Sequence, residues 1–313
     1  EIEIPDEPEE EEKEIIKEEK HQKEDEETEE IEAVEAKSKF GLFPTKKFSQ
    51  PKLENYTLPP LSLLQSSVEK PTTGDLRANA NIIKRTLESF GIAVEMGEIN
   101  IGPKVTRYTL KPAEGMKLSR ITALSQDLSL SLAAHPIRIE APIPGKSLVG
   151  IEVPNKTAAL VRLGSLMSYK EFLDSGMLSF ALGRDVTGEP IFADIAKMPH
   201  ILVAGATGSG KSVVIHSILI SLLYRHSPNT LRLILVDPKR VELSVYSGLP
   251  HLISPVITEN KKAIGVFRWA LSEMDSRYDV LQKAGNRDIK SYNAANKDEP
   301  LANILIVIDE LAD

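Results

Sequence analysis

The sequence contains no cysteine. Disulfide bonds, zinc sites built on thiolates and cysteine nucleophiles are therefore all excluded, and the absence is compatible with a reducing cytosol. The six histidines are scattered along the chain without the short spacings that recur among metal ligands. We therefore interpret them as surface or packing residues and expect the function to rest on other residue types.

Long apolar runs are also missing. No run approaches the roughly 18–20 residues that a membrane-spanning helix needs, and the longest, "SILISLLY" and "ILIVI", have the length of core elements. The chain begins with Glu1 and carries no signal-peptide pattern, so we expect it to be a piece of a larger protein. With 313 residues, of which 41% are hydrophobic, it is long enough for about two domains.

Basic residues are scarce at the beginning of the chain. Residues 1–37 hold 19 acidic residues against 5 lysines, so the net charge of −8 divides into −14 there and +6 over 38–313. This acidic tail has too few apolar residues to offset its ordering entropy, and residues 38–73 are rich in Pro and Ser. We therefore expect a disordered linker over 1–73, in which "YTLPPLSLL" could dock as an extended arm.

A small α/β domain is expected over 74–155. Its elements would be a helix over 75–91, strands over 92–102 and 104–112, a second helix over 117–134, and a hairpin over 137–155. Helical spacing places five apolar side chains on the core face of the first helix: Leu76, Ala80, Ile83, Leu87 and Phe90. Gly91 follows them as a typical C-terminal stop.

Residues 156–313 show the pattern of a parallel α/β domain. A hairpin over 178–195 is followed by three strands that are apolar without alternation, at 201–205, 231–237 and 303–309. Such strands, separated by helical stretches at 212–224 and within 259–284, are typical of a parallel sheet covered on both faces. The last helical stretch carries an apolar stripe that we interpret as core: Ile264, Phe267, Leu271, Met274, Tyr278 and Leu281.

The segment "GATGSGKS" fits the phosphate-binding pattern G-x-x-x-x-G-K-[ST] at every specified position. The expected strand before it and helix after it are the context that the pattern requires. Its glycines allow positive φ and a close approach of the backbone to an anion, and N–H groups at the helix N-terminus would then face the phosphates. The residues expected to bind ATP are Gly205, Ala206, Thr207, Gly208, Ser209, Gly210, Lys211 and Ser212.

The segment "ILIVIDELAD" supplies the other half of the expected site. Its apolar strand would end at Asp309, on the carboxyl edge of the sheet, where the carboxylate could hold Mg²⁺ directly or through water. Glu310 could polarise a water for attack on the γ-phosphate. In the loop, Lys211 would meet the β/γ-phosphate oxygens and the Ser212 hydroxyl would ligate Mg²⁺. Lys211 and Glu310 are thus the predicted catalytic residues, and Ser212 and Asp309 the predicted metal ligands.

Three further groups of charged residues are less specific. The loop "VDPKRVEL" would place Asp237, Lys239 and Arg240 on the same edge, where contact with the site, contact with a neighbouring subunit and a loop salt bridge all remain open. Arg277 is interpreted as a solvated helix residue. The small domain also contains a basic group, which we interpret as a solvated face more readily than as a direct phosphate contact: Lys104, Arg107, Lys111, Lys117 and Arg120.

Five stretches of the sequence resemble the FtsK/SpoIIIE family of bacterial DNA translocases. In the second domain these are "LGRDVTGEPIFADIAKMPHILVAGATGSGKSV", "ILVDPKRVEL" and "ILIVIDELAD"; in the small domain they are "GPKVTRYTLKPAEGMKLSRI" and "VGIEVPN". The resemblance covers roughly 74–313. It implies a RecA-like P-loop ATPase that works as a homo-oligomeric ring, a hexamer, and pumps double-stranded DNA through a central channel using ATP and Mg²⁺.

The resemblance also implies a cellular setting and further segments of the protein before Glu1 and after Asp313. The expected role is chromosome segregation at cell division or sporulation, on the cytoplasmic side of the bacterial cell membrane, with the membrane anchor upstream of Glu1. A winged-helix module, and a strand that lies between the two motif strands of the sheet, would follow Asp313. We therefore expect a RecA-like sheet truncated after its second motif strand, and low ATP turnover by these 313 residues alone.

Two other functions remain open from the sequence. FtsK-like ATPases that drive polypeptide secretion carry the same loop, although the basic body and the small domain favour DNA. A nucleotide-binding interaction module without hydrolysis is the third reading, and the intact Lys211, Ser212, Asp309 and Glu310 argue against it. Stimulation of the ATPase by duplex DNA would separate the first two functions.

Overall fold

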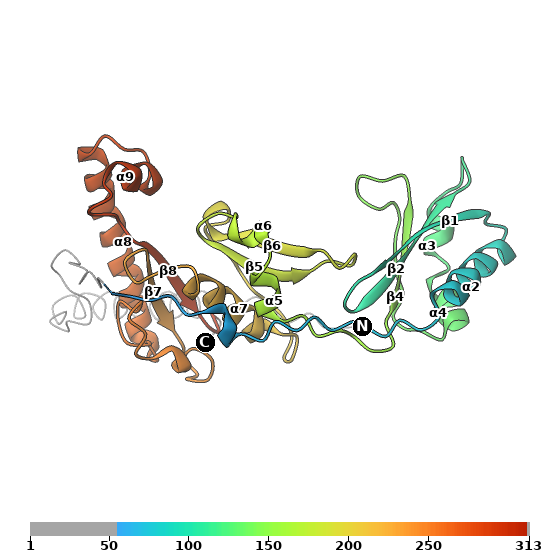
Figure 1. The fold of residues 1–313 in the computed structure, drawn as a ribbon, viewed down its shortest axis with the longest axis horizontal. Helices are drawn as coiled ribbons and strands as arrows, with labels where there is room; N and C mark the ends of the chain where they lie inside the picture. Colours follow the sequence, from blue (N-terminus) through green and yellow to red (C-terminus); the bar gives the residue numbers. More distant parts are fainter. Residues whose placement is uncertain (1–54, 312–313) are drawn as a thin grey trace, which may run out of the picture. The chain divides into compact units, whose positions relative to one another are not determined.

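The structure, a computed structural model, describes residues 55–311 (Figure 1). The predicted acidic tail and most of the predicted linker lie outside the described residues. Contacts divide the described chain into two compact units, 55–230 and 231–311, and each is described by itself. Within 55–311, no helix is both long and apolar enough to cross a membrane.

The first unit contains a four-stranded antiparallel sheet with strand order β1-β2-β4-β3. Its strands are β1 (Val94–Ile101), β2 (Val105–Pro112), β3 (Arg138–Glu140) and β4 (Val149–Pro154). Three helices pack with it around one core: α2 (Leu76–Ser89), α3 (Ser119–Thr122) and α4 (Ser125–Leu132). The predicted first helix, both strands and the β3–β4 hairpin are confirmed.

Helix α2 begins at a side-chain cap. The Asp75 carboxylate accepts hydrogen bonds from the N–H groups of Arg77 and Ala78, as an N-cap residue should. Of the predicted core face, Ile83 and Leu87 are fully buried, and Leu76 and Ala80 pack against the core. Phe90 is 46% exposed, so its assignment to the core was wrong: it lies beyond the last helical residue and no longer follows the helical face.

The predicted second helix over 117–134 is two helices. Helix α3 ends at Thr122 and α4 begins at Ser125, because Leu124 has φ −87° and ψ 16° and leaves the helical path. The apolar periodicity continues across this break, since Ile121 and Leu128 are both fully buried in the same core. Periodicity therefore predicted the buried face of this stretch but not its interruption.

The predicted arm docks against the chain that follows the small sheet. Its 3-10 helix η1 (Leu61–Leu63) contacts α5 (Leu163–Met167), and Leu64 joins the core around α5. Thr72 and Thr157 pair through their backbones, and Arg162 bonds the side chains of Gln65 and Glu69. The segment "YTLPPLSLL" therefore docks, as was left open for it, although Leu61–Leu63 form a 3-10 helix and not an extended arm.

A second hairpin supports the helix that follows the phosphate-binding pattern. Strands β5 (Ser179–Arg184) and β6 (Pro190–Asp194) are antiparallel, as predicted for 178–195, and precede the 3-10 helix η2 (Ile195–Lys197). Helix α7 (Lys211–Leu223) packs against β5, where the Ser221 hydroxyl accepts the Ala181 N–H at 3.3 Å. The short helix α6 (Lys170–Leu173) contributes Phe172 to the shared core.

The second unit is built on two parallel strands. Strands β7 (Leu231–Val236) and β8 (Asn303–Ile308) pair in register, and segment 251–257 bonds the other edge of β7. The other elements are η3 (Ser244–Tyr246), α8 (Asn260–Lys283) and α9 (Ile289–Ala295). All six residues of β7 are buried, whereas those of β8 are half-buried. The strands predicted at 231–237 and 303–309 are confirmed.

Two further expectations were wrong. The strand predicted at 201–205 does not form among the described residues; it joins no ladder, and Leu202 is 79% exposed. A strand is held by hydrogen bonds to its neighbours, so apolar composition alone does not make one. The apolar stripe of α8 is also mostly exposed, with Ile264 at 58% and Leu271 at 59%. The buried side of α8 runs instead through Ala263, Val266 and Trp269.

Candidate nucleotide-binding loop and carboxylate edge

Residues 205–210 lead through a turn into α7, whose first two residues are Lys211 and Ser212. Gly208 and Gly210 have φ of +79° and +101°, which other L-residues rarely adopt, and Gly210 is the N-cap of the helix. A side chain on Gly205 would meet the Ser209 hydroxyl, which would have to turn away. The geometry therefore favours glycine most clearly at Gly208 and Gly210.

This geometry fits a triphosphate. Helix α7 has Gly210 at its N-cap, and this residue has no side chain that could cap the first N–H groups of the helix. Such a terminus, which also carries the positive end of the helix dipole, favours an anion. Lys211 and Ser212 are the first two residues of the helix, and both are partly exposed.

The helix that carries the loop is firmly anchored. Leu219, Leu222 and Leu223 are buried, and at the end of α7 the Arg225 guanidinium donates to the Phe172 and Ser175 carbonyls. The same guanidinium lies 4.9 Å from the Phe172 ring centroid. The loop therefore rests on a rigid support at its C-terminal side.

The second predicted motif lies at the carboxyl end of β8. Asp309 is 4% exposed, and its N–H donates to the Val236 carbonyl at 2.9 Å, which continues the ladder beyond the strand. Glu310 has φ +58°, an uncommon conformation for a residue other than glycine. Its side chain is 33% exposed. The two neighbouring carboxylates thus have different surroundings, one buried at the sheet edge and one partly open to solvent.

Asp309 and Ser212 offer the oxygen ligands that Mg²⁺ prefers. Within 55–311, no three His, Cys, Asp or Glu side chains gather in a way that could hold a metal ion. Nucleotide-bound Mg²⁺ takes only one or two carboxylates and completes its shell with phosphates and waters, so the residues present fit that kind of ion. The loop and the carboxylates belong to different units of the chain.

Asp237, which the sequence placed at the same edge, organises the loop after β7. Its buried carboxylate accepts the N–H groups of Leu243 at 2.9 Å, Ser244 at 3.1 Å and Val241 at 3.2 Å, and the Ser244 hydroxyl at 3.2 Å. Burial alone would raise the pKa of this carboxyl, but these hydrogen bonds outweigh it and hold the pKa below its usual range. Asp237 is therefore a structural anion that fixes the course of 238–244.

The loop so fixed brings a lysine to the predicted base. The Lys239 Nζ lies 3.5 Å from the Glu310 Oε2. The loop therefore forms a salt bridge, and it does so with a residue of the predicted site; contact with a neighbouring subunit stays a prediction. The motif showed that the two residues share an edge but held no signal for the pairing, which depends on how Asp237 folds the loop.

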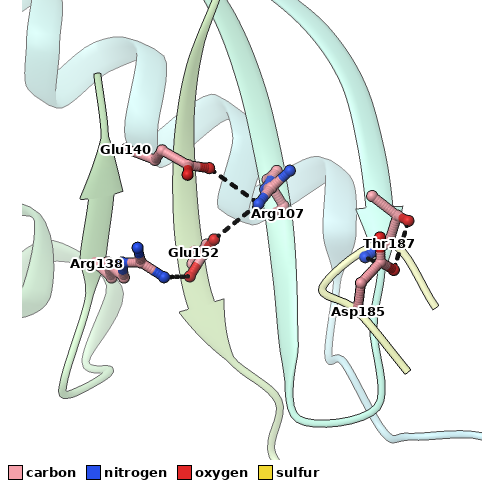
Figure 2. A network of polar contacts seen from close by, with 6 residues as sticks. All are labelled: Arg107, Arg138, Glu140, Glu152, Asp185 and Thr187. Atoms are coloured by element: carbon pink, nitrogen blue, oxygen red, sulfur yellow. Dashed lines mark hydrogen bonds and ion pairs between the residues drawn. The ribbon is translucent and has the colours of Figure 1, made fainter. Parts of the chain in front are cut away.

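Two other basic residues singled out from the sequence, Arg107 and Arg277, have structural partners. Arg107 contacts Glu140 and Glu152 at 3.0 and 3.1 Å, and Glu152 also meets Arg138 at 3.7 Å (Figure 2). Arg277, expected to be solvated, is 13% exposed: its Nη1 donates to the Ala302 carbonyl at 2.8 Å. It thus ties α8 to the start of β8, and the expectation was wrong because a long side chain can reach inward from a helix flank.

Comparison with known proteins gives two matched regions. The sequence matches the FtsK alpha domain over residues 58–155 and the FtsK/SpoIIIE family over residues 163–311. The DNA translocase FtsK of Caldanaerobacter subterraneus subsp. tengcongensis is 48% identical over 271 residues, which cover 86% of this chain and 38% of that protein. The DNA translocase FtsK of Clostridium tetani is 46% identical over 268 residues, 83% of this chain and 36% of that protein.

The chain therefore spans little more than a third of the length of these curated relatives. Among solved structures, it is similar to the pCW3 conjugation coupling protein TcpA in its monomer form with ATPgS. The TM-score is 0.43 at 24% sequence identity, over 75% of this chain and 65% of that one.

Proposed function

Because this chain belongs to the FtsK/SpoIIIE family, we propose that it is the ATP-hydrolysing part of a motor that moves along double-stranded DNA. One observation carries the proposal: a segment with the complete phosphate-binding pattern leads into the N-terminus of α7, in a chain 48% identical to a DNA translocase. The relatives are longer than this sequence, so activity and partners are assigned here as a proposal for the full-length gene product.

The residues of the loop and the carboxylate edge receive separate roles. Lys211 neutralises the β/γ-phosphate oxygens, and the backbone of 205–210 binds the phosphates through its N–H groups. Ser212 and Asp309 would hold Mg²⁺, which when bound supplies charge neutralisation at the phosphates. Glu310 accepts the proton of the water that attacks the γ-phosphate, because it is the more exposed of the two carboxylates.

The proposed partners follow from the relatives. We assign duplex DNA as the track and a homo-oligomeric ring, a hexamer, as the working assembly, acting in chromosome segregation at the cytoplasmic side of the bacterial cell membrane. The positive balance of charge over 38–313 suits a polyanionic track. We also propose a small domain over 74–155 and a RecA-like motor domain from 156 onward. This boundary differs from the one between the two compact units, which lies at 230/231, and the division stays a prediction.

The experiment is ATP hydrolysis by the full-length gene product with and without duplex DNA. We expect duplex DNA to raise the rate severalfold, Lys211→Ala to abolish hydrolysis, and the affinity for DNA to fall steeply with salt because phosphate contacts release counterions. Lys262→Met is a matched control, since Lys262 pairs only with the neighbouring Glu259 at the start of α8 among the contacts described. No stimulation by DNA, with stimulation by a polypeptide substrate instead, would contradict the proposal.

A further inference from the structure

Two turns leave the same edge of the β7–β8 sheet and meet there. Val236 and Ile308 are partners in the parallel register, so Asp237 and Asp309 follow them at equivalent places. Beyond these aspartates the chain continues to Lys239 on one side and to Glu310 on the other, where Nζ and Oε2 lie 3.5 Å apart. The parallel register therefore sets up this pair.

On the lysine side of the pair, the Asp237 carboxylate fixes the backbone of the loop. The buried Asp237 carboxylate binds three backbone N–H groups of the loop and the Ser244 hydroxyl, and the Arg240 N–H donates to the Asp237 carbonyl at 3.1 Å. Arg240 has φ +59°, which turns the chain directly after Lys239. The backbone of Lys239 is thus fixed by a buried anion rather than left to a mobile loop.

The glutamate side is partly open to solvent. Glu310 follows the strand in a left-handed conformation and its side chain is one-third exposed. A glutamate has three rotatable bonds, so a partly exposed carboxylate samples several positions unless a partner selects one. One partner of this carboxylate is Lys239, whose own side chain is 51% exposed.

An ion pair this exposed contributes little to folding, because solvent screens the attraction and both side chains lose freedom. It does change where the carboxylate lies. A general base works only within hydrogen-bond reach of the proton it accepts, and small displacements of a catalytic group lower the rate sharply. The consequence of the pair is therefore expected in the rate of the chemical step.

We propose that Lys239 is a positioning residue that holds the Glu310 carboxylate in place for ATP hydrolysis. The proposal rests on the proposed function, since it needs Glu310 to act as the base. Lys239 acts through Glu310 and not on the nucleotide, so nucleotide binding by the loop at 205–212 is independent of it. An arginine at 239 would keep both the charge and the reach.

The test compares Lys239→Met, Lys239→Arg and the control Lys262→Met in the full-length gene product with duplex DNA. Lys262→Met also removes a partly exposed Lys–Glu pair of the same unit, at the start of α8. We expect Lys239→Met to lower kcat about 10- to 100-fold, with KM for ATP within about twofold of wild type. Lys239→Arg recovers most of kcat, and Lys262→Met leaves both constants unchanged.

Two readouts do not depend on turnover. Affinity for a non-hydrolysable ATP analogue should be equal in wild type and Lys239→Met, and the thermal unfolding midpoint should differ by no more than between wild type and Lys262→Met. In crystal structures, the Glu310 side chain should occupy one rotamer in wild type and in Lys239→Arg, and several in Lys239→Met. A second variant, Lys239→Gln, should reproduce the loss of kcat.

Three results would overturn the inference: an unchanged kcat in Lys239→Met, a raised kcat, which would make the lysine a restraint, or a loss that appears in KM alone. Glu310→Gln separates this failure from failure of the proposed function. If Glu310→Gln abolishes hydrolysis while Lys239→Met does not, only the positioning role is wrong. If Glu310→Gln hydrolyses ATP like wild type, the proposed role of Glu310 is wrong.

Discussion

Arg107 lies between two carboxylates on the small sheet, and this network shows what single residues do there. Glu152 is directly opposite Arg107 on the neighbouring strand, and Arg138 is opposite Glu152 on the next, so the charges alternate across β2, β4 and β3 (Figure 2). Arg107 and Glu152 are 14% and 5% exposed, whereas Arg138 is 70% exposed. Burial therefore separates an essential contact from a peripheral one.

The difference predicts unequal losses of stability. Arg107→Met leaves Glu140 and the buried Glu152 without their shared guanidinium and should lower the free energy of unfolding by about 2–4 kcal/mol. Arg138→Met removes a solvent-screened contact and should change it by no more than about 0.5 kcal/mol. Denaturant unfolding of the two variants measures both values. Equal losses in the two variants would contradict the expectation that the buried contacts of Arg107 stabilise the fold more than the exposed contact of Arg138.

His226 gives the chain a pH dependence. It is 2% exposed, with Nε2 2.6 Å from the Met177 carbonyl and Nδ1 3.2 Å from the Thr230 hydroxyl. Burial lowers the pKa of this imidazole, and the nearby Arg225 lowers it further, against the opposing effect of the Met177 carbonyl. In the unfolded chain the pKa is about 6.5, so the unfolded state binds the proton first as the pH falls.

Because the unfolded chain binds the proton at a higher pH than the folded chain, acid lowers the stability of the fold. The stabilisation due to a neutral His226 is fully present above about pH 6.5 and is lost progressively as the pH falls below it. Thermal unfolding midpoints between pH 7.5 and 5.5 should therefore drop more steeply in wild type than in His226→Gln. His135→Gln, at an exposed position, serves as the control and should keep the wild-type slope. Parallel slopes for wild type and His226→Gln would contradict the argument.

At the scale of single residues, the sequence predicted the turn of the backbone at 205–210, whereas phosphate binding there stays a prediction. Its pattern spans eight consecutive positions, and the positive φ of Gly208 and Gly210 is a local requirement that the residue type reveals. The Lys239–Glu310 pair could not be predicted in the same way. It depends on the register of β7 against β8 and on the contacts of Asp237 with residues up to seven positions away.

Helix α8 shows the limit of pattern reading at the scale of elements. Its position was predicted, but it carries two apolar sides, and periodicity selected the side that is exposed. Val266 packs with Ile234, Val236 and Ile257 against the strands. Which side of such a helix is buried depends on the neighbours it meets, and the helical sequence alone does not contain that information.

The two sides of α8 predict opposite outcomes of truncation. Val266→Ala removes buried methyl groups and should lower the free energy of unfolding by about 1–3 kcal/mol. Leu271→Ala, at 59% exposure, should change it by no more than about 0.5 kcal/mol. Denaturant unfolding of both variants is the measurement. A larger loss for Leu271→Ala would restore the interpretation of the stripe as core.

The segment 201–205 differs from the other predicted strands for a reason of the same scale. Strands β7 and β8 have each other as hydrogen-bond partners, and β7 also bonds 251–257. The apolar composition of 201–205 resembles theirs, yet it joins no ladder in the described chain. Composition predicts that a segment tends to be buried, but a strand also needs an adjacent backbone with free donors and acceptors.

At the scale of the whole molecule, the prediction of a mixed α/β P-loop ATPase is confirmed by the family match over 163–311. The resemblance stated from five sequence stretches is also confirmed, because both family domains and relatives at 46–48% identity match. Oligomeric state, DNA contacts and cellular role could not be read from residues of one chain, since they depend on surfaces between molecules. They remain proposals.

We propose that ATP hydrolysis at 205–212, Asp309 and Glu310 drives movement along duplex DNA. Displacement of a third DNA strand from a duplex by the full-length gene product tests it most directly, because only a protein that travels along the duplex removes that strand. We predict displacement that requires hydrolysable ATP and is lost in Lys211→Ala and Glu310→Gln, with DNA binding retained. DNA-stimulated ATP hydrolysis without any strand displacement would contradict the claim.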